Sequence, residues 1–326
     1  MRLVARLIKL TCRAIAVLAP SVLWLAAAVA QPWPSRPITL LVAFPPGSIS
    51  DYVARVIAHD LSSTLGQTVI VENKPGGGGA IASLTVARAP ADGYDLLMTA
   101  IGPAVLRPLI DSKLQYDTVA DFTPIILIGD TPNVFVTGPT SRFGNVRDIV
   151  AYASQNPGKL TIGHPGPGTM GHLAALLFAT EAHISANFIS YQGSASIVSD
   201  LVGEHIDVGS IAYGGSASAA RLLAVTTDER PSFLPDIPTM RESNLPNVSA
   251  STWHAIFAPA GLAPEAVSML NKALNALLDK PEVRNQFSKI GYRVLGGPPE
   301  RLRQRIIDDR AKWSAVVQAA HITINR

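Results

Sequence analysis

The regular alternation of short apolar runs with amphipathic helical stretches limits the fold of this chain more than any other feature. Residues 38–44 form one apolar run, and residues 50–65 follow with apolar side chains at helical spacing, from Val53 to Leu65. Buried strands that alternate with amphipathic helices are typical of α/β units built around mostly parallel sheets. The sequence therefore predicts an α/β fold.

The expected elements fall into two series with no low-complexity linker between them. The first has strands at 38–44, 68–71, 96–99 and 124–128, and helices at 50–65 and up to about residue 88. The second begins near Asn133, with strands at 134–136, 159–163, 187–190, 206–210 and 222–226 and helices at 146–154, 169–182 and 195–202. A strand at 254–258 then precedes helices at 264–278, 281–290 and 299–320, each of which begins with proline, a residue tolerated in the first helical turn.

The N-terminal segment, residues 1–30, reads as a cleaved secretory signal peptide. Four basic residues and no acidic one precede an apolar run at 14–29, and the run ends in the small-x-small sequence of residues 28–30. An uncleaved membrane anchor is the alternative, but the run is short for a bilayer span. A lipoprotein signal is disfavoured because Cys12 precedes the apolar run.

Removal of this segment changes what the composition allows. The net charge falls from +3 to −1, so no concentrated basic field remains for a nucleic acid partner. Cys12 is the only cysteine, so the mature chain has no thiol catalysis, disulfide, zinc–thiolate site or iron–sulfur cluster. About 296 residues are enough for two domains, and no later apolar stretch approaches transmembrane length. We expect a soluble, periplasmic and monomeric mature protein.

Three polar turns, each between a predicted strand and a predicted helix, are candidates for ligand binding. They comprise residues 44–51, 163–172 and 191–195. A helix start offers unpaired N–H groups and a positive dipole end, which suit an anion. In the first turn, Ser50 is either the cap of the helix or a hydroxyl donor to a ligand. The alternative for this turn is a purely structural helix cap that binds no ligand.

Other chemistry has weaker support. Gly166, Gly168 and Gly171 spell G-x-G-x-x-G, but the turn is not in the first βα unit and has no acidic residue about twenty positions on, which argues against a dinucleotide cofactor. His164 and His172 flank this turn without a set of metal-ligating partners, so packing histidines are favoured. The chain has no G-x-S-x-G or H-E-x-x-H motif, so we expect no enzyme activity, cofactor or metal.

Over its whole mature length the chain resembles the substrate-binding proteins of tripartite tricarboxylate transporters, the Bug or TctC family. The segments that carry the resemblance, in order, are W-P-S-R-P-I at 33–38, F-P-P-G at 44–47 with Asp51, V-E-N-K-P-G at 71–76, A-D-G-Y at 91–94, Y-D at 116–117, D-F at 121–122, N-P-G-K-L at 156–160, G-T at 168–169, H-L at 172–173, Tyr191 with G-S at 193–194, L-P-D-I-P-T at 234–239 and A-P-A-G at 258–261.

The resemblance implies a type II, two-lobed periplasmic binding protein with mostly parallel sheets and two crossover strands. Lobe 1 would comprise residues 31–131 plus 252–326, and lobe 2 residues 132–251. A small organic carboxylate would lie in the crevice between the lobes, for transfer to the integral-membrane subunits of a transporter. By position, the ligand-binding residues would be Gly47, Ser48, Ser50, Gly168, Thr169, Tyr191, Gly193 and Ser194.

Two other functions compete with transport. A ligand-sensing receptor of the same fold would bind the same class of compound without passing it to a transporter. An exported hydrolase would use Ser50 or Ser194 with one of the histidines, although no motif supports it. Residues 209–221 are shorter than is usual in the family, and Pro167 removes one N–H from the second turn, so we expect an altered pocket.

Overall fold

The structure is a computed structural model that describes residues 33–231 and 233–319. By its internal contacts the chain divides into two compact units, Met1–Ser35 and Arg36–Arg326. Only residues 33–35 of the first unit are described, so the predicted signal peptide lies outside the described residues. All elements below belong to the second unit.

The first series of strands and helices forms a parallel group, as predicted. Strand β1 (Ile38–Val42) pairs in parallel with β2 (Val69–Asn73) on one side and with β3 (Asp95–Ala100) on the other. Helices α2 (Ile49–Leu65) and α3 (Ala80–Ala87) connect these strands, with a short turn of helix, η1 (Gly77–Gly79), before α3. A π-helical turn, η2 (Gly102–Leu106), and the short α4 (Arg107–Ile110) follow β3.

The long strand β4 (Phe122–Thr137) joins this group to the second one. Its first part pairs antiparallel with β9 (Ser251–Pro259), from Phe122 opposite Pro259 to Pro132 opposite Ser251. Two separate strands, at 124–128 and 134–136, were expected here, and this prediction is wrong. Gly129 and Pro132 resemble a break locally, but the strand continues because residues 122–132 pair with β9 and the remaining residues pair with two later strands.

The second group of strands repeats the parallel arrangement. Strand β5 (Leu160–His164) pairs in parallel with β6 (Ala186–Ser190) and β7 (Val208–Ala212). Both β7 and β8 (Arg221–Val225) pair antiparallel with the last part of β4. Helices α5 (Val146–Gln155), α6 (Met170–Glu181) and α7 (Ser194–Val202) and the 3-10 turn η3 (Gly215–Ala219) connect these strands. The fold class is therefore α/β, as predicted.

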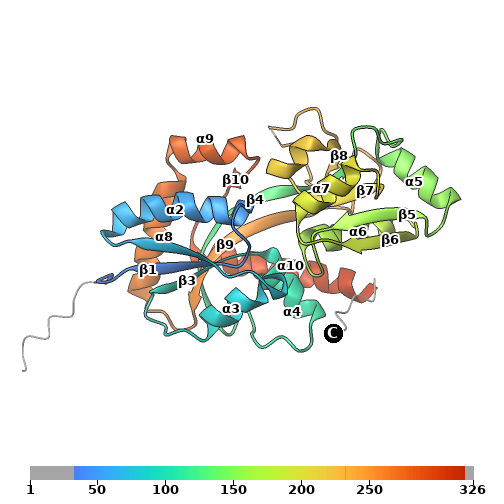
Figure 1. The fold of residues 1–326 in the computed structure, drawn as a ribbon. Helices are drawn as coiled ribbons and strands as arrows, with labels where there is room; N and C mark the ends of the chain where they lie inside the picture. The colour runs from blue at the N-terminus through green and yellow to red at the C-terminus, as the bar shows by residue number, and fades with distance from the viewer. Residues whose placement is uncertain (1–32, 232, 320–326) are drawn as a thin grey trace, which may run out of the picture. The chain divides into compact units, whose positions relative to one another are not determined.

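The three C-terminal helices pack against β4 and the elements beside it. Helix α8 (Pro264–Leu278) contacts α2 and β4, and α9 (Pro281–Lys289) contacts the short strand β10 (Arg293–Val294). Helix α10 (Pro299–Ala319) contacts β4, η2 and α4. In Figure 1, α2 and α8 lie on one side of the strands β1, β3 and β9, and α3 and α4 lie on the other. The division into lobes at residues 131 and 252 stays a prediction.

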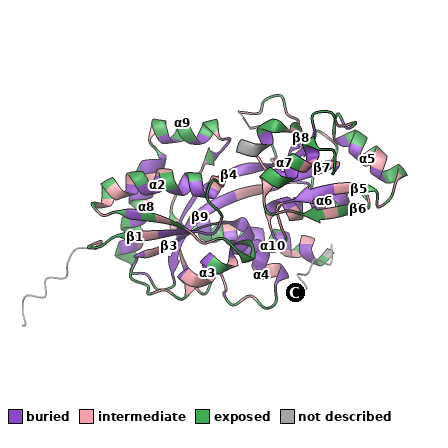
Figure 2. Cartoon of the chain, in the orientation of Figure 1, coloured by how far each residue is buried: buried purple, intermediate pink, exposed green. Residues whose placement is uncertain are grey.

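The core follows the sheet from one strand group into the other. Strands β3, β4 and β9 are almost entirely buried, as Figure 2 shows. One apolar cluster contains Leu41 of the first group, Phe178 of the second, and Trp313 of α10. Among residues 33–231 and 233–319, the structure contains no helix with the length and apolar character needed to cross a membrane.

Candidate functional site

The first predicted turn ends β1 and begins α2 with a compact set of backbone hydrogen bonds. Gly47 has a φ of +79°, a left-handed conformation that favours glycine. Ser48 caps the helix, because its hydroxyl oxygen accepts the N–H of Asp51 at 3.2 Å. The N–H of Gly47 donates in turn to Oδ2 of Asp51 at 3.0 Å. The interpretation of Ser50 as the cap is wrong: the turn at Gly47 places Ser48 at the extended capping position, and Ser50 is buried within the helix.

Asp51 is an ionised carboxylate whose Oδ2 accepts hydrogen bonds from the Gly47 N–H and from Nε of Arg55. Burial opposes its ionisation, but hydrogen bonds from Arg55, from the Gly47 N–H and from Asn73 outweigh this and lower the pKa of the Asp51 carboxyl below its usual value. Arg55 lies one helical turn on and forms an ion pair with Asp51 at 2.9 Å. The start of α2 therefore carries a buried negative charge whose counter-ion lies at the surface.

The second predicted turn, between β5 and α6, has the same build. Gly168 has a φ of +74° and Thr169 caps the helix, accepting the N–H of His172 at 3.3 Å. The N–H of Gly168 donates to Nδ1 of His172, also at 3.3 Å. The hydroxyl of Thr169 donates to the carbonyl of Gly166 at 2.7 Å. His172 therefore occupies the place in this turn that Asp51 occupies in the first.

Two stacked imidazoles lie at this second turn. The rings of His164 and His172 are 4.3 Å apart between centroids and inclined by 29°. Burial and the neighbouring His164 lower the pKa of His172 to about 3, and burial also lowers the pKa of His164. The Nδ1 atom of His164 is buried and has no hydrogen-bond partner among the described residues. Both rings are therefore uncharged near neutral pH. No group of three or more potential metal ligands occurs among the described residues.

The third predicted turn adjoins the second, but the side chain of Tyr191 points toward α7. The N–H of Tyr191 donates to the carbonyl of His164 at 2.9 Å. The Tyr191 hydroxyl donates to Oδ2 of Asp200 in α7 at 2.6 Å, and burial together with this carboxylate raises the pKa of Tyr191 to about 12. Gly193 precedes α7 with a φ of +133° and open space around it, and Ser194 is the first residue of the helix.

Backbone contacts link the second turn to the first group of strands. The carbonyl of Gly168 lies 3.2 Å from the position that a side chain on Gly102 would take. A side chain on Gly79 would meet both Pro103, which follows Gly102, and Ala43 at the end of β1. The second and third turns are thus in direct contact with each other, and the first connects to them through Gly79 and the β3–η2 turn.

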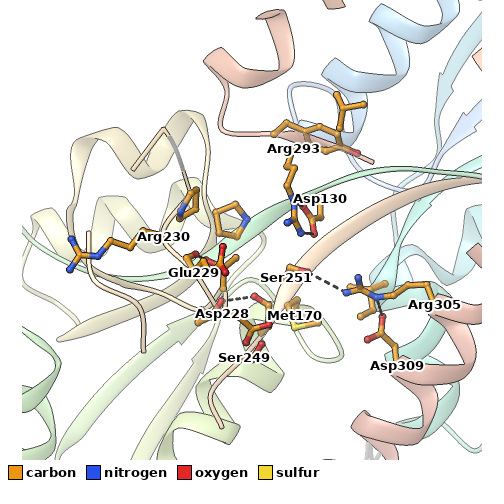
Figure 3. Close-up of a pocket in the computed structure, with 18 of the residues that line it drawn as sticks. Asp130, Met170, Asp228, Glu229, Arg230, Ser249, Ser251, Arg293, Arg305 and Asp309 are labelled. Atoms are coloured by element: carbon orange, nitrogen blue, oxygen red, sulfur yellow. Dashed lines mark hydrogen bonds and ion pairs between the residues drawn. The ribbon is translucent and has the colours of Figure 1, made fainter. Parts of the chain in front are cut away.

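The structure also contains a hollow of about 900 Å³ that the sequence did not predict (Figure 3). None of the eight predicted site residues lines it, although Met170, which follows Thr169, does. Its lining comes from the middle of β4, from residues 226–231 and 249–251, and from β10 and the C-terminal helices. These parts are distant in sequence, so no local pattern could have revealed the hollow.

The two buried carboxylates that line this hollow, Asp130 and Asp309, are each paired with an arginine. Arg293 donates to both oxygens of Asp130, at 2.9 and 2.7 Å. Arg305 donates to Oδ2 of Asp309 at 2.6 Å, and the Nε1–H of Trp253 reaches the same oxygen at 2.7 Å. Figure 3 shows Arg293 and Arg305 on one side of the hollow and the loop with Asp228 on the other. The arrangement connects β4 and β9 to β10 and α10, which is a structural role.

Sequence reasoning did not assign a role to His172 in the second turn. The signal available was the spacing: an acceptor three residues after a capping Ser or Thr typically reaches back to the backbone before the helix. Ser48 with Asp51 and Thr169 with His172 both have this spacing.

Comparison with known proteins places the chain in a protein family. Residues 53–322 match the model of the tripartite tricarboxylate transporter family receptor, TctC. The chain is 32% identical over 304 residues to protein BugT of Bordetella pertussis, covering 89% of this chain and 90% of BugT.

The chain is also similar to solved structures. The chain resembles R. palustris Rpa4515 with adipate, with a TM-score of 0.84 and 32% identity over 89% of this chain and 99% of that one. It also resembles MatC from Rhodopseudomonas palustris with bound malate, with a TM-score of 0.81 and 27% identity over 87% of this chain and 100% of that one.

Proposed function

Because the chain belongs to the tripartite tricarboxylate transporter receptor family, we propose that it captures a small organic carboxylate in the periplasm and passes it to integral-membrane transporter subunits. The ligand would be bound reversibly, without turnover, between the two strand groups. The proposed contacts are Gly47, Ser48, Ser50, Gly168, Thr169, Tyr191, Gly193 and Ser194.

The observation that carries this proposal is the pair of matching helix starts at α2 and α6. Each combines a left-handed glycine, a capping hydroxyl and an acceptor that reaches back to the glycine N–H. The first N–H groups of a helix have no partner within it, and together with the helix dipole they favour an anion. Relatives of the same fold were solved with adipate and with malate, which are carboxylates.

The first experiment is to extract the purified protein under denaturing conditions and identify any retained compound by mass spectrometry. The emptied and refolded protein is then titrated with mono-, di- and tricarboxylates while thermal unfolding is followed. A ligand that binds only the folded state increases the free energy of unfolding, by about 2.7 kcal/mol at a ligand concentration a hundred times Kd. The unfolding temperature rises as a result. Absence of any shift across such a panel, with no compound in the extract, would contradict the proposal.

A further inference from the structure

Next to the first turn, the two strand groups touch through apolar side chains that pack on glycines. Gly214 immediately precedes η3 with a φ of +149°, and Cδ1 of Ile49 lies 2.7 Å from the position that a side chain on Gly214 would take. The carbonyl of Ile290 lies 3.8 Å from the same position. Ile49 at the start of α2 therefore fills the space that Gly214 leaves, beside the residue that follows α9.

A second contact of this kind lies next to the first. Gly291 follows Ile290 with a φ of +70°, and the ring of Tyr213 packs where a side chain on Gly291 would lie. The ring of Phe233 approaches the same position to 3.1 Å. The rings of Tyr213 and Phe233 stack, with centroids 5.7 Å apart and planes inclined by 18°. Two aromatic rings therefore cover the backbone of the turn between α9 and β10.

The residues of these two contacts belong to parts of the chain that pack on different strand groups. Tyr213 and Gly214 connect β7 to η3, and the N–H of Tyr213 donates to the carbonyl of Pro132 in β4 at 2.9 Å. On the other side, α2 contacts β1 and α8, and α8 contacts α9. We call this set of residues the clasp, with Ile49, Ile290 and Gly291 on the side of the first strand group and Tyr213, Gly214 and Phe233 on the side of the second.

The clasp favours the arrangement in which the two strand groups lie against each other. The chain passes from the first group to the second along β4 and returns at β9. A movement about these two strands that separates the groups would part Gly291 from Tyr213 and Phe233 and expose the apolar surface that they bury. Burial of apolar surface is favourable in proportion to its area, so this separation costs free energy.

We infer that Tyr213 and Phe233 are positioning residues: through their contact with Gly291 they hold the two strand groups closed on the ligand and so set how slowly the ligand leaves. This inference rests on the proposed function and deepens it. A ligand that contacts both strand groups is released when the clasp opens. A weaker clasp lowers the closed fraction of the protein and speeds release.

Distances between two spin labels test the clasp without any ligand. Cys12, in the predicted signal peptide, is the only cysteine of the chain, so Ser199→Cys in α7 and Gln286→Cys in α9 introduce a unique pair of labelling sites. Both residues are exposed, and their helices adjoin the clasp on its two sides. We expect Tyr213→Ala and Phe233→Ala each to increase the fraction of molecules with a long label distance.

The matched control is Met269→Ala, which removes an exposed apolar side chain of α8 outside the clasp. It should leave the label distances unchanged. A role of the two rings in local packing alone would lower the unfolding temperature of Tyr213→Ala and Phe233→Ala but would not change their label distances.

Release of adipate provides the second readout. In stopped-flow displacement, Tyr213→Ala and Phe233→Ala should release adipate about fivefold faster or more than the wild type, because the closed arrangement loses apolar contact that the open one lacks. Met269→Ala should release it at the rate of the wild type.

The two readouts separate the inference from the proposed function. Label distances in Tyr213→Ala and Phe233→Ala equal to those in Met269→Ala would overturn the inference while the proposed function stands. If circular dichroism shows that the alanine variants do not fold, Phe233→Leu decides by the same measurement, because it keeps an apolar side chain and removes the stacked ring. A wild-type protein that binds no carboxylate would remove the proposed function and the role in ligand release, whereas the label distances would still decide whether the two rings hold the strand groups together.

Discussion

At the scale of single residues, the helix starts of α2 and α6 depend on glycines in a left-handed conformation. Gly47 and Gly168 have φ values of +79° and +74°, and each places its N–H opposite the side chain four residues on. Any other L-residue is strained in this conformation, by roughly 1–2 kcal/mol. These two positions therefore shape the proposed site through the backbone.

Substitution of these glycines by alanine should destabilise the protein to different extents. At Gly47 a side chain would meet no atom within 4 Å, so only the backbone strain of about 1 kcal/mol is expected. At Gly168 it would lie 3.1 Å from Cδ1 of Ile110, so Gly168→Ala should cost more. Denaturant unfolding of the two variants measures both costs, and an equal cost would show that the contact with Ile110 relaxes freely.

Two histidines, His172 and His254, should make the protein less stable as the pH falls. The folded-state pKa is about 3 for His172 and about 4 for the fully buried His254, against an ordinary value near 6.5. Between pH 6.5 and these values the unfolded chain binds protons that the folded chain does not, so stability is present above pH 6.5 and is lost on acidification. Each histidine should account for about 2 kcal/mol of the loss between pH 7 and pH 5.

The variant His172→Asn provides the control, because asparagine keeps an acceptor and does not titrate. Urea unfolding at pH 7 and pH 5 should show a loss about 2 kcal/mol smaller in this variant than in the wild type. The same pH dependence in both proteins would mean that His172 titrates normally in the folded state.

At the scale of elements, most strands and helices could be predicted from the sequence because their signal is local. The helical stripe of residues 50–65 corresponds to α2 within one residue, and the prolines at 264, 281 and 299 begin α8, α9 and α10 as predicted. The continuity of β4 could not be predicted, because it depends on pairing with β7, β8 and β9, which are distant in sequence.

The attachment of α10 to β9 should depend on one carboxylate. Asp309 accepts hydrogen bonds from Trp253 and Arg305, and both Asp309 and Trp253 are buried. Its replacement by alanine leaves the indole N–H without a partner and should cost roughly 2–4 kcal/mol. Asp308→Ala is the matched control, since this neighbouring residue is exposed and should change stability by about 0.5 kcal/mol or less. A cost for Asp309→Ala no larger than the control would contradict the structural role.

At the scale of the whole molecule, the proposed ligand contacts come from both strand groups. Hydrogen–deuterium exchange tests this directly. Addition of a bound carboxylate should slow the exchange of amides in residues 47–51 and 168–172 together, because one ligand orders both helix starts. The start of α5, residues 144–148, has the same hydrogen-bond pattern and should not change. Protection of only one of the two helix starts would place the ligand on one strand group alone.

Some properties of this protein are determined by local sequence and others by contacts between distant residues. The amino-acid sequence alone established the α/β class, the three polar turns and the family resemblance, since apolar periodicity, glycine positions and residue spacing are written within short windows. Tertiary structure decided that β4 is one strand and that Asp130 at the hollow pairs with Arg293. Both depend on which atoms from different parts of the chain come within hydrogen-bonding or packing distance, and no short window of sequence contains that information.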